Sequence, residues 1–316
     1  MQTILNIGAD VAKDEIVVAC SQNTFGIRTL QNRRSDLTAW LTLLPKPSRI
    51  GLESTSSYHE LLADLAHAMG FTVFVLNPRE IRHYAKAVGA RAKTDCIDAQ
   101  LIARYVAHEH PQLLTYQPPT IEQRRIDQLL KRRAKVSSIR ASLRQSFKGL
   151  SGFNIELTTV LANLDDLIDK IDTALTYHCN KCPAQSKSQE LLQTIDGIGP
   201  IVGISLSNLM QHVRFKTSDA IVAFVGYDTR VKDSGQKSGR RRLSKRGPAE
   251  LRRLLFIAAM AATKTKLWKP IYEQYRARGL STTAVLCIIA RKILRTAWSI
   301  HKYQTPFDPQ RLISHA

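Results

Sequence analysis

Residues 3–20 read TILNIGADVAKDEIVVAC and contain two short apolar runs separated by a polar turn. The first run, TILNI, ends at Gly8-Ala9-Asp10, and the second, EIVVAC, has a β-branched centre. Short apolar runs bounded by turn residues are typical of β-strands. We therefore expect the chain to begin with two strands and to place a carboxylate, Asp10, where the first strand ends.

The next hundred residues extend this pattern into a sheet. Leu37, Trp40, Leu41 and Leu44 recur at helical spacing, whereas TVFVL is a continuous apolar run that suits a covered strand and stops at Asn77-Pro78. The predicted order β-β-β-α-β-α-β-α fits a ribonuclease-H-like sheet, in which the first and fourth strands are neighbours. That strand order is taken from fold analogy, because periodicity does not define it. The further elements are expected as strands at 25–30, 49–52 and 72–76 and helices at 31–44 and 58–69.

Four acidic residues stand where these predicted elements end or begin. Asp10 and Glu53 end the first and fourth strands, and Asp95 and Asp98 open a helix that Thr94 is expected to cap. Residues three apart share a helix face, with Cβ atoms about 5–6 Å apart, so the two carboxylates repel unless a cation lies between them. Hard oxygen donors favour Mg²⁺, and two ions about 3.5–4 Å apart would stabilise an in-line displacement at phosphorus. The alternative is that Asp95 and Asp98 only favour the helix dipole.

The composition indicates an anionic partner. The 316 residues carry a formal net charge of +20, with a pI near 10.0, and the positive charge lies in runs rather than being spread evenly. Nucleic acid is the commonest partner of such a protein. No apolar segment is long enough to span a membrane, Asp10 comes too early for a secretory leader, and the five cysteines show no disulfide framework. We expect a bacterial-type, nucleoid-associated cytoplasmic protein that binds DNA.

The middle of the chain predicts two long helices. Leu129, Val136, Leu143 and Leu150 recur every seven residues, although Arg133 and Arg140 interrupt the other seam position. After Ser151-Gly152, six apolar residues alternate by four and three, which is a coiled-coil pattern. The two helices would form an antiparallel hairpin or a dimer arm. The basic residues of the first helix line either a nucleic-acid surface or a solvated face: Arg124, Arg125, Lys131, Arg132, Arg133 and Lys135.

Two short motifs follow this arm. Cys179 and Cys182 form a CxxC, but a structural zinc site needs four ligands and no second pair exists, so we interpret the segment as a loop between domains. Gly197 and Gly199 in DGIGP resemble the turn of a helix-hairpin-helix, where glycines let a phosphate approach the backbone. A tight connection between two helices explains the same glycines equally well.

Cationic residues cluster in two loops. Arg91 and Lys93 precede the Asp95–Asp98 pair and are either phosphate contacts or solvated loop cations. Residues 226–247, GYDTRVKDSGQKSGRRRLSKRG, form a polar, glycine-punctuated stretch with Ser234 near its centre. A serine is a weak nucleophile unless a base or a metal activates it, and no histidine is nearby, so a turn serine is the simpler interpretation from this stretch alone. The cations that would neutralise phosphates here are Lys237, Arg240, Arg241, Arg242, Lys245 and Arg246.

The motifs IGADVAKD, GLESTSSY, AKTDCIDAQLIA, DGIGP, AFVGYDTR and DSGQKSGRRRLSKRGPAELRRLL occur in this order over nearly the whole chain. Together they resemble the transposases of the insertion sequence 110 family and the related site-specific DNA invertases. The resemblance implies a RuvC-like catalytic domain over 1–115, a coiled-coil arm over 116–185 and a mostly helical C-terminal transposase domain over 186–316. One departure is ESTSSY, where many relatives have a glycine after the threonine; Glu53 itself is retained.

The same resemblance implies the chemistry. The family's four-acid motif falls on Asp10, Glu53, Asp95 and Asp98, which would hold Mg²⁺, and its nucleophilic serine falls on Ser234. Members of the family recombine DNA under a bridge RNA that pairs with donor and target DNA, so the protein itself reads little sequence. Acids and serine from different protomers can cooperate, which implies a dimer or tetramer.

Two other functions remain open from the sequence. A RuvC-like nuclease would use the same acids with water as the nucleophile and would give Ser234 no catalytic part. A nucleic-acid-binding protein with a decayed metal site would bind DNA without Mg²⁺-dependent chemistry, although four intact acids argue against decay.

Overall fold

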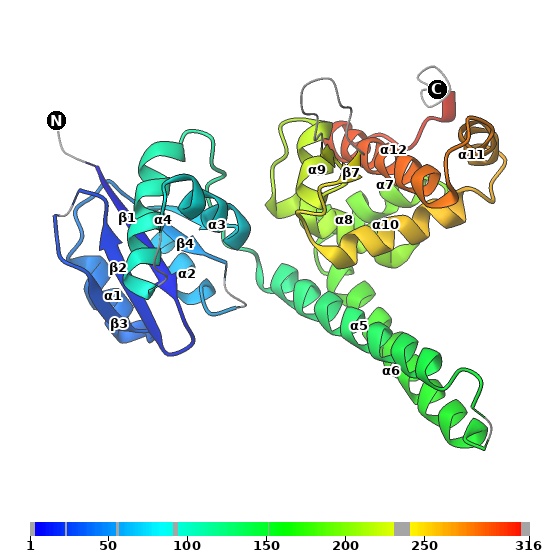
Figure 1. Cartoon of the computed structure of the whole chain (residues 1–316), viewed down its shortest axis with the longest axis horizontal. Helices are drawn as coiled ribbons and strands as arrows, with labels where there is room; N and C mark the ends of the chain where they lie inside the picture. The colour runs from blue at the N-terminus through cyan, green and yellow to red at the C-terminus, as the bar shows by residue number, and fades with distance from the viewer. Residues whose placement is uncertain are drawn as a thin grey trace. The chain divides into compact units, whose positions relative to one another are not determined.

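The computed structural model describes residues 4–22, 24–54, 57–90, 94–150, 152–230 and 241–310. Internal contacts divide the chain into two compact units, Met1–Pro118 and Pro119–Ala316. Figure 1 shows the sheet-containing first unit in blue to cyan and the helical second unit in green to red. Among the described residues, no helix has both the length and the apolar character needed to cross a bilayer.

A five-stranded mixed sheet forms the centre of the first unit. Its strands are β1 (Leu5–Val11), β2 (Glu15–Cys20), β3 (Arg28–Gln31), β4 (Ser48–Glu53) and β5 (Thr72–Leu76), in the order β3-β2-β1-β4-β5. The pairs β1–β2 and β2–β3 are antiparallel, whereas β1–β4 and β4–β5 are parallel. The predicted ribonuclease-H-like order is confirmed, because the first and fourth strands are neighbours.

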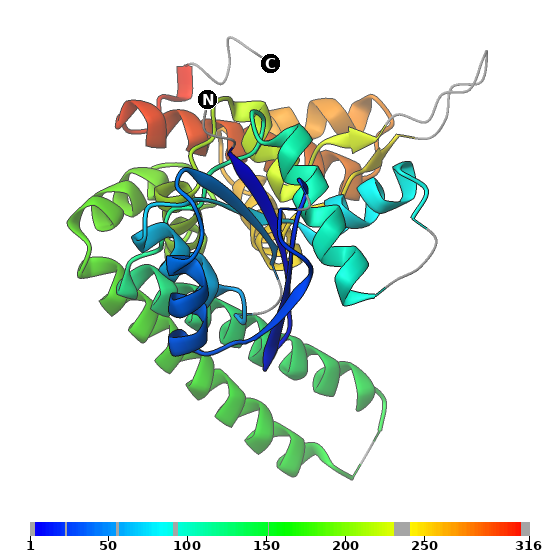
Figure 2. The same ribbon diagram turned by 90° about the vertical axis from the view of Figure 1, so that its left-hand side faces the viewer.

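Helices cover both faces of this sheet. Helices α1 (Arg34–Thr42) and α2 (Glu60–Ala68) contribute Leu37, Trp40 and Leu62 to the core on one face. Helix α4 (Asp95–Glu109) covers the other face, and α3 (Pro78–Ala87) packs with it through Ile81. Figure 2 shows the blue α1 and the cyan α3 and α4 on opposite sides of the strands.

Two strand glycines let α4 approach the sheet closely. A Cβ atom built on Gly8 would lie 2.1 Å from the carbonyl oxygen of Ala99 and 2.3 Å from the backbone nitrogen of Ala103. A Cβ atom on Gly51 would lie 2.3 Å from a methyl group of Val106. Because these are backbone or buried atoms, α4 fits against β1 and β4 only when both positions are glycine.

This close fit predicts a large effect of one added methyl group. We expect Gly8→Ala to lower the free energy of unfolding by about 1–3 kcal/mol, the usual cost of overpacking a core. Urea-induced unfolding of the full chain measures the change. Gly26→Ala is the matched control, because no atom of the described residues lies within 4 Å of a Cβ atom there. An equal loss in both variants would contradict the packing explanation.

The structure corrects several predictions for the first unit. The third strand begins at Arg28 rather than at residue 25, and α1 spans Arg34–Thr42 rather than 31–44. Helix α3 was not predicted, because Asn77-Pro78 was interpreted only as the end of a strand. In the structure Asn77 caps α3, its Oδ1 accepting a hydrogen bond of 2.9 Å from the backbone N–H of Arg79, and Pro78 is the first helical residue.

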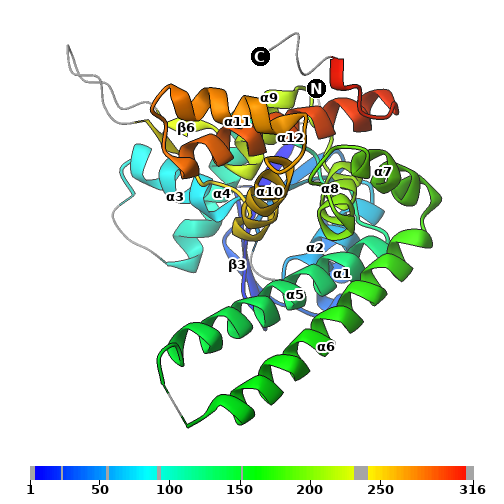
Figure 3. The same cartoon turned by 90° about the vertical axis from the view of Figure 1, so that its right-hand side faces the viewer.

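The second unit begins with an antiparallel helical hairpin. Helix α5 (Ile121–Ser146) starts with a capping box formed by Thr120 and Gln123, and α6 (Asn154–Asn180) returns along it, as Figure 3 shows. The predicted hairpin is confirmed, although α5 ends before Leu150, which is exposed. The apolar contact between the helices comes from Ile126 of α5 and from Ile171, Leu175 and Cys179 of α6.

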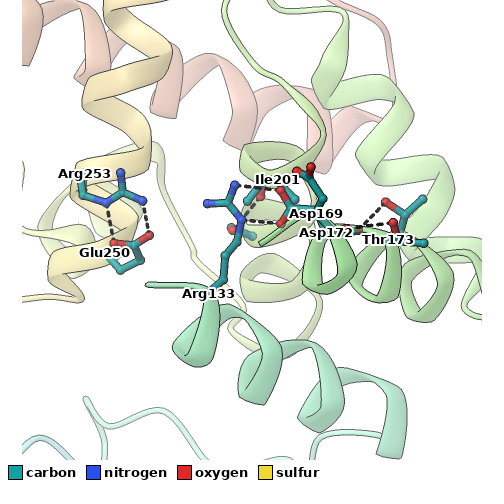
Figure 4. A network of polar contacts seen from close by, with 9 residues as sticks. Arg133, Asp169, Asp172, Thr173, Ile201, Glu250 and Arg253 are labelled. Atoms are coloured by element: carbon teal, nitrogen blue, oxygen red, sulfur yellow. Dashed lines mark hydrogen bonds and ion pairs between the residues drawn. The ribbon is translucent and has the colours of Figure 1, made fainter. Parts of the chain in front are cut away.

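The two arginines that interrupt the heptad pattern are partners of α6. Arg133 donates two hydrogen bonds to Asp172, of 2.5 and 2.9 Å, and Arg140 Nη2 donates to Asp165 Oδ2 at 2.8 Å. From the first pair to the second, the arginine lies seven residues later in the chain and the aspartate seven residues earlier, as expected for antiparallel helices. Figure 4 shows Arg133 reaching from α5 to Asp172. Arg133 is therefore an interhelical residue, a position that neither alternative left open by the sequence, a nucleic-acid surface or a solvated face, gave to it.

Among the residues that the structure describes, six further helices form a compact bundle after the hairpin. They are α7 (Pro183–Gln193), α8 (Pro200–His212), α9 (Ser218–Val225), α10 (Ala249–Ala262), α11 (Trp268–Ala277) and α12 (Thr282–Tyr303). Leu255, Trp268 and Ile289 lie fully buried at the centre of its core. The mostly helical character expected for this part of the chain is confirmed, and α12 is its longest helix, whereas α9 and α11 were not predicted individually.

The CxxC segment is not a loop between domains. Cys179 is buried in the last turn of α6, and Cys182 caps the start of α7. The backbone N–H of Cys182 donates to the carbonyl of Cys179 at 3.1 Å, so the two helices follow one another through a single tight turn. The interpretation as an interdomain loop was wrong.

Candidate active site

Asp10 and Glu53 lie at the same edge of the sheet. The register of β1 and β4 pairs Ala9 with Leu52, so the next pair along the two parallel strands is Asp10 with Glu53. Side chains alternate along a strand, which places these two carboxylates on the face of Gly8 and Gly51, the face covered by α4. Both residues are half-buried.

The first turn of α4 brings the remaining two acids to this face. Thr94 caps the helix as predicted, its Oγ1 accepting a hydrogen bond of 3.3 Å from the backbone N–H of Ile97. Asp98 is half-buried and Asp95 is exposed. Ala99, which follows Asp98, packs against Val17, and Val17 is the register partner of Asp10 on β2. The helix therefore starts over the part of the sheet that carries Asp10.

The donor chemistry of this edge fits a hard divalent cation. All four predicted ligands are carboxylates, which Mg²⁺ prefers to softer donors. Within the described ranges, no group of three or more His, Cys, Asp or Glu residues is arranged to hold a metal ion. Asp10, Glu53 and Asp98 each have an interaction partner within the protein. The prediction of a divalent metal rests on the chemical type of these donors and on their position at one edge of the sheet.

The stretch around Ser234 is defined by its two flanks. Ser234, Lys237 and Arg240 lie outside the described residues, as do Arg91 and Lys93 of the first unit. Before and after this stretch, β6 (Thr229–Arg230) and β7 (Arg242–Leu243) pair antiparallel. The four predicted phosphate-binding cations that the structure describes are all exposed: Arg241, Arg242, Lys245 and Arg246.

Hydrogen bonds join the two ends of this loop. We call this hydrogen-bonded base of the loop the stem. The backbone N–H of Ser244 donates to the carbonyl of Asp228 at 2.9 Å, and the Ser244 hydroxyl donates to the Asp228 carboxylate. The N–H of Lys245 donates to the carbonyl of Gly226 at 3.1 Å. Gly226 has a φ of +81°, and its Cβ would lie 2.6 Å from the Arg246 nitrogen, so only glycine fits there.

Arg252 of α10 ties the stem to the helical core. Its Nη1 donates to the carbonyls of Val225 at 2.9 Å and Gly247 at 2.5 Å, one on each side of the loop. The hydroxyl of buried Tyr227 donates to the carbonyl of Arg252 at 2.9 Å, and burial raises the pKa of this tyrosine. The two ends of the loop are therefore held together by one side chain.

This anchor predicts a specific loss of stability. We expect Arg252→Met to lower the free energy of unfolding by about 1.5–3 kcal/mol, because hydrogen bonds from a charged donor are lost while the carbonyl acceptors stay behind. Thermal and urea unfolding of the full chain measure the loss. Arg253→Met is the control: Arg253 pairs with Glu250 on the helix surface at 2.6 Å (Figure 4), and such pairs contribute about 1 kcal/mol or less. Equal losses in the two variants would contradict the anchoring role.

The predicted nucleic-acid contacts on α5 differ in exposure. Arg125, Lys131 and Arg132 are exposed on α5, whereas Arg124 is half-buried and its Nε donates to the carbonyl of Pro119 at 3.4 Å.

The turn that contains Gly197 packs closely against α10. A Cβ atom on Gly197 would lie 2.3 Å from the carbonyl oxygen of Ala258. That close approach to α10 accounts for Gly197 as a tight helix connection, the alternative that the sequence left open.

Gly199 differs from Gly197, although both belong to the same turn. It caps α8, and none of the atoms in the described part of the chain lies within 4 Å of a Cβ atom placed on it. Contacts within the chain therefore do not require glycine at this position, and a role at a phosphate remains a prediction.

Sequence reasoning missed the residues of the stem. Tyr227, Asp228, Ser244 and Arg252 stand in the quoted motifs, but no role was predicted for any of them. Gly226 and Gly247 bracket the basic stretch in the sequence and were the available signal. Whether Gly226 and Gly247 lie close together depends on the packing of α9 against α10, which the sequence pattern does not reveal.

Comparisons with known proteins agree with this architecture. Residues 7–150 match the family model of the IS110-type DEDD transposases, described as "Transposase", and residues 189–276 match the model described as "Transposase IS116/IS110/IS902 family". A ribonuclease-H-like acidic domain followed by this helical region defines the class: the protein is a transposase, an enzyme of DNA transesterification. The DEDD domain implies the use of divalent metal, and the class implies DNA as the substrate.

The similar proteins match nearly the whole chain. The pilin gene-inverting protein of Moraxella bovis is 28% identical over 96% of this chain and 97% of its own length. The transposase for insertion sequence element IS1328 of Yersinia enterocolitica is 25% identical over 98% of this chain and 100% of its own. The transposase for IS1111A of Coxiella burnetii is 25% identical over 95% and 90%. The chain belongs to the IS116/IS110/IS902 family of transposases.

Proposed function

We propose that this transposase cuts and exchanges DNA strands through a covalent link between Ser234 and a DNA end, guided by a structured bridge RNA. The observation that carries the proposal is the shared edge of Asp10 and Glu53, with the first turn of α4 on the same face. A second support is the stem, which holds the two ends of the Ser234 stretch together.

The proposed reaction consists of two transesterifications. The Ser234 hydroxyl loses its proton and attacks the scissile phosphorus; the bond from phosphorus to the 3′-oxygen breaks, and that oxygen takes up a proton. The serine then carries the 5′-phosphate of one DNA end. A 3′-hydroxyl of the partner strand attacks this phosphoserine, which restores the serine. Two Mg²⁺ ions, held by Asp10, Glu53, Asp95 and Asp98, would neutralise the charge that develops at phosphorus and lower the pKa of the attacking hydroxyl.

Guidance by RNA and an oligomeric assembly complete the proposal. The exposed cations Arg241, Arg242, Lys245 and Arg246 suit contacts to phosphates, which position a nucleic acid without reading its bases. Pairing between guide RNA and DNA would then supply the sequence specificity. A dimer or tetramer would allow the acids of one protomer to act with the Ser234 of another.

A denaturing gel tests the chemistry. We expect wild-type protein, incubated with Mg²⁺, guide RNA and labelled DNA, to form a protein–DNA adduct that survives denaturation and disappears when EDTA is added at the start. Metal-dependent cleavage without any adduct would mean that water is the nucleophile and that the protein acts as a nuclease.

DNA inversion is a second candidate function. Two of the similar proteins are pilin gene-inverting proteins, and they match nearly the full length of this chain. Both reactions would use the same acids and serine, so they differ only in how the DNA sites are arranged. A plasmid with two inverted sites that changes its restriction pattern, without insertion into new DNA, would favour the invertase.

A further inference from the structure

The exposed side of α3 carries a stripe of basic residues. Arg79, Arg82, His83 and Lys86 are all exposed, and they stand at the spacing i, i+3, i+4 and i+7. At 3.6 residues per turn, these four positions fall within roughly 100° of the helix circumference. We call these four residues the α3 stripe. The opposite side of the helix packs through Ile81 and Tyr84 onto α4.

Carboxylates do not neutralise most of this stripe. Within the described part of the chain, none of the ion pairs includes Arg82, His83 or Lys86. Glu80, the one acid of α3, lies near Tyr105 of α4, where burial and then Glu80 raise the pKa of the tyrosine. In the second unit, by contrast, Arg133 and Arg253 are paired with acids. Arg82 and Lys86 are therefore available to an external anion.

The helix starts at the edge that carries the acids. Strands β1, β4 and β5 are parallel, so their carboxyl ends meet at one edge of the sheet. Leu76, the last residue of β5, is the register partner of Glu53, and α3 begins two residues later at Pro78. The stripe thus leads away from the edge where Asp10 and Glu53 lie.

The length of the stripe suits one nucleic-acid strand. Seven residues of α-helix rise about 10.5 Å. Along a duplex, each strand carries one phosphate per about 3.4 Å of helix axis, so the stripe covers about three phosphates.

We propose that the α3 stripe binds the phosphate backbone of the DNA strand that is cut, on the side of the scissile phosphate next to β5. The inference rests on the proposed function in one respect only, which is that the scissile phosphate lies at the carboxylate edge. DNA is favoured over guide RNA because α3 starts two residues after the register partner of Glu53, next to the edge where the strand that is cut would meet the acids. The contact is to phosphates and therefore independent of base sequence.

Salt-dependent binding tests this proposal. Wild-type protein and the double variant Arg82→Gln/Lys86→Gln are titrated with a labelled DNA duplex in EDTA, which prevents cleavage, at several salt concentrations. Each lost phosphate contact reduces the slope of log K against log[salt] by about 0.9 for duplex DNA, so we expect a reduction of about 1.8. Far-ultraviolet circular dichroism checks that the variant is folded.

A matched control removes the same charge away from α3. Arg28 lies on β3, the strand farthest from β5 in the sheet order, and Lys46 precedes β4 at the amino end of that strand; both residues are exposed. Arg28→Gln/Lys46→Gln should therefore keep the wild-type slope. An equal reduction in both variants would overturn the proposal, because net charge alone would explain it. So would an unchanged slope in the α3 variant, or a reduction seen with a structured RNA but not with DNA.

The proposed chemistry can fail independently of this surface. If the wild-type protein forms no denaturation-resistant adduct but the α3 variant still loses salt dependence, the phosphoserine mechanism is wrong and the DNA-binding surface stands. If adducts form at the wild-type rate and the slope does not change, the surface is wrong and the mechanism stands.

Discussion

Replacing Ser234 with alanine is expected to abolish covalent DNA trapping and strand exchange. The variant lacks the only protein atom that the proposed mechanism joins to phosphorus, so the loss in rate should be at least about 10³-fold. Adduct formation on a denaturing gel and recombinant product from a plasmid substrate measure the two steps separately. DNA binding should stay near the wild-type level, because the exposed cations of the stem are untouched.

Ser238→Ala supplies the matched control in the same stretch of sequence. It removes an identical hydroxyl four residues away and should leave adduct formation within a few-fold of wild type. Cleavage by the Ser234→Ala protein at the wild-type rate would identify water as the nucleophile. Equal losses in both variants would show that the hydroxyls act on the conformation of the loop rather than on the chemistry.

Asp98→Asn is expected to have a comparable effect on catalysis. The substitution keeps the size of the side chain and removes a charge from the predicted metal site, so adduct formation should fall at least about 10³-fold at saturating Mg²⁺. Salt-dependent DNA binding, measured in EDTA, should persist. The concentration of Mg²⁺ needed for half-maximal activity should rise if any residual activity is measurable.

Asp36→Asn separates this role from a simple helix-dipole effect. Asp36 is an exposed acid in the first turn of α1, as Asp98 is an acid in the first turn of α4. If Asp98 only stabilised its helix, each variant would lose about 0.3–1 kcal/mol of stability and keep its activity. Full activity of Asp98→Asn would therefore remove this residue from the proposed site.

The elements that were predicted well are those in which local preference and tertiary structure agree. The runs at Leu5–Val11, Glu15–Cys20 and Thr72–Leu76 are apolar because both faces of the sheet are covered, and the same property makes them visible in the sequence. Thr94 has the capping side chain that starts α4 wherever the helix packs. Helix α3 was missed because Asn77-Pro78 serves both to end a strand and to start a helix, and only the chain beyond it decides between them.

The sequence by itself determined the strand order by analogy, the hairpin, the class of enzyme and the four acids with Ser234 as candidates. Tertiary structure alone decided what depends on contacts between distant segments. In the sequence, Arg133 and Arg140 interrupt a heptad pattern, but in the folded chain each of them pairs with an aspartate of α6. The sequence around Gly197 resembles a phosphate-binding turn, but in the structure α10 packs directly against this glycine. The position of the α3 stripe next to the acids likewise depends on the tertiary structure, because the parallel strands bring Glu53 and the start of α3 to one edge of the sheet. A side chain's type fixes which interactions it can make, and only the folded chain supplies the partner.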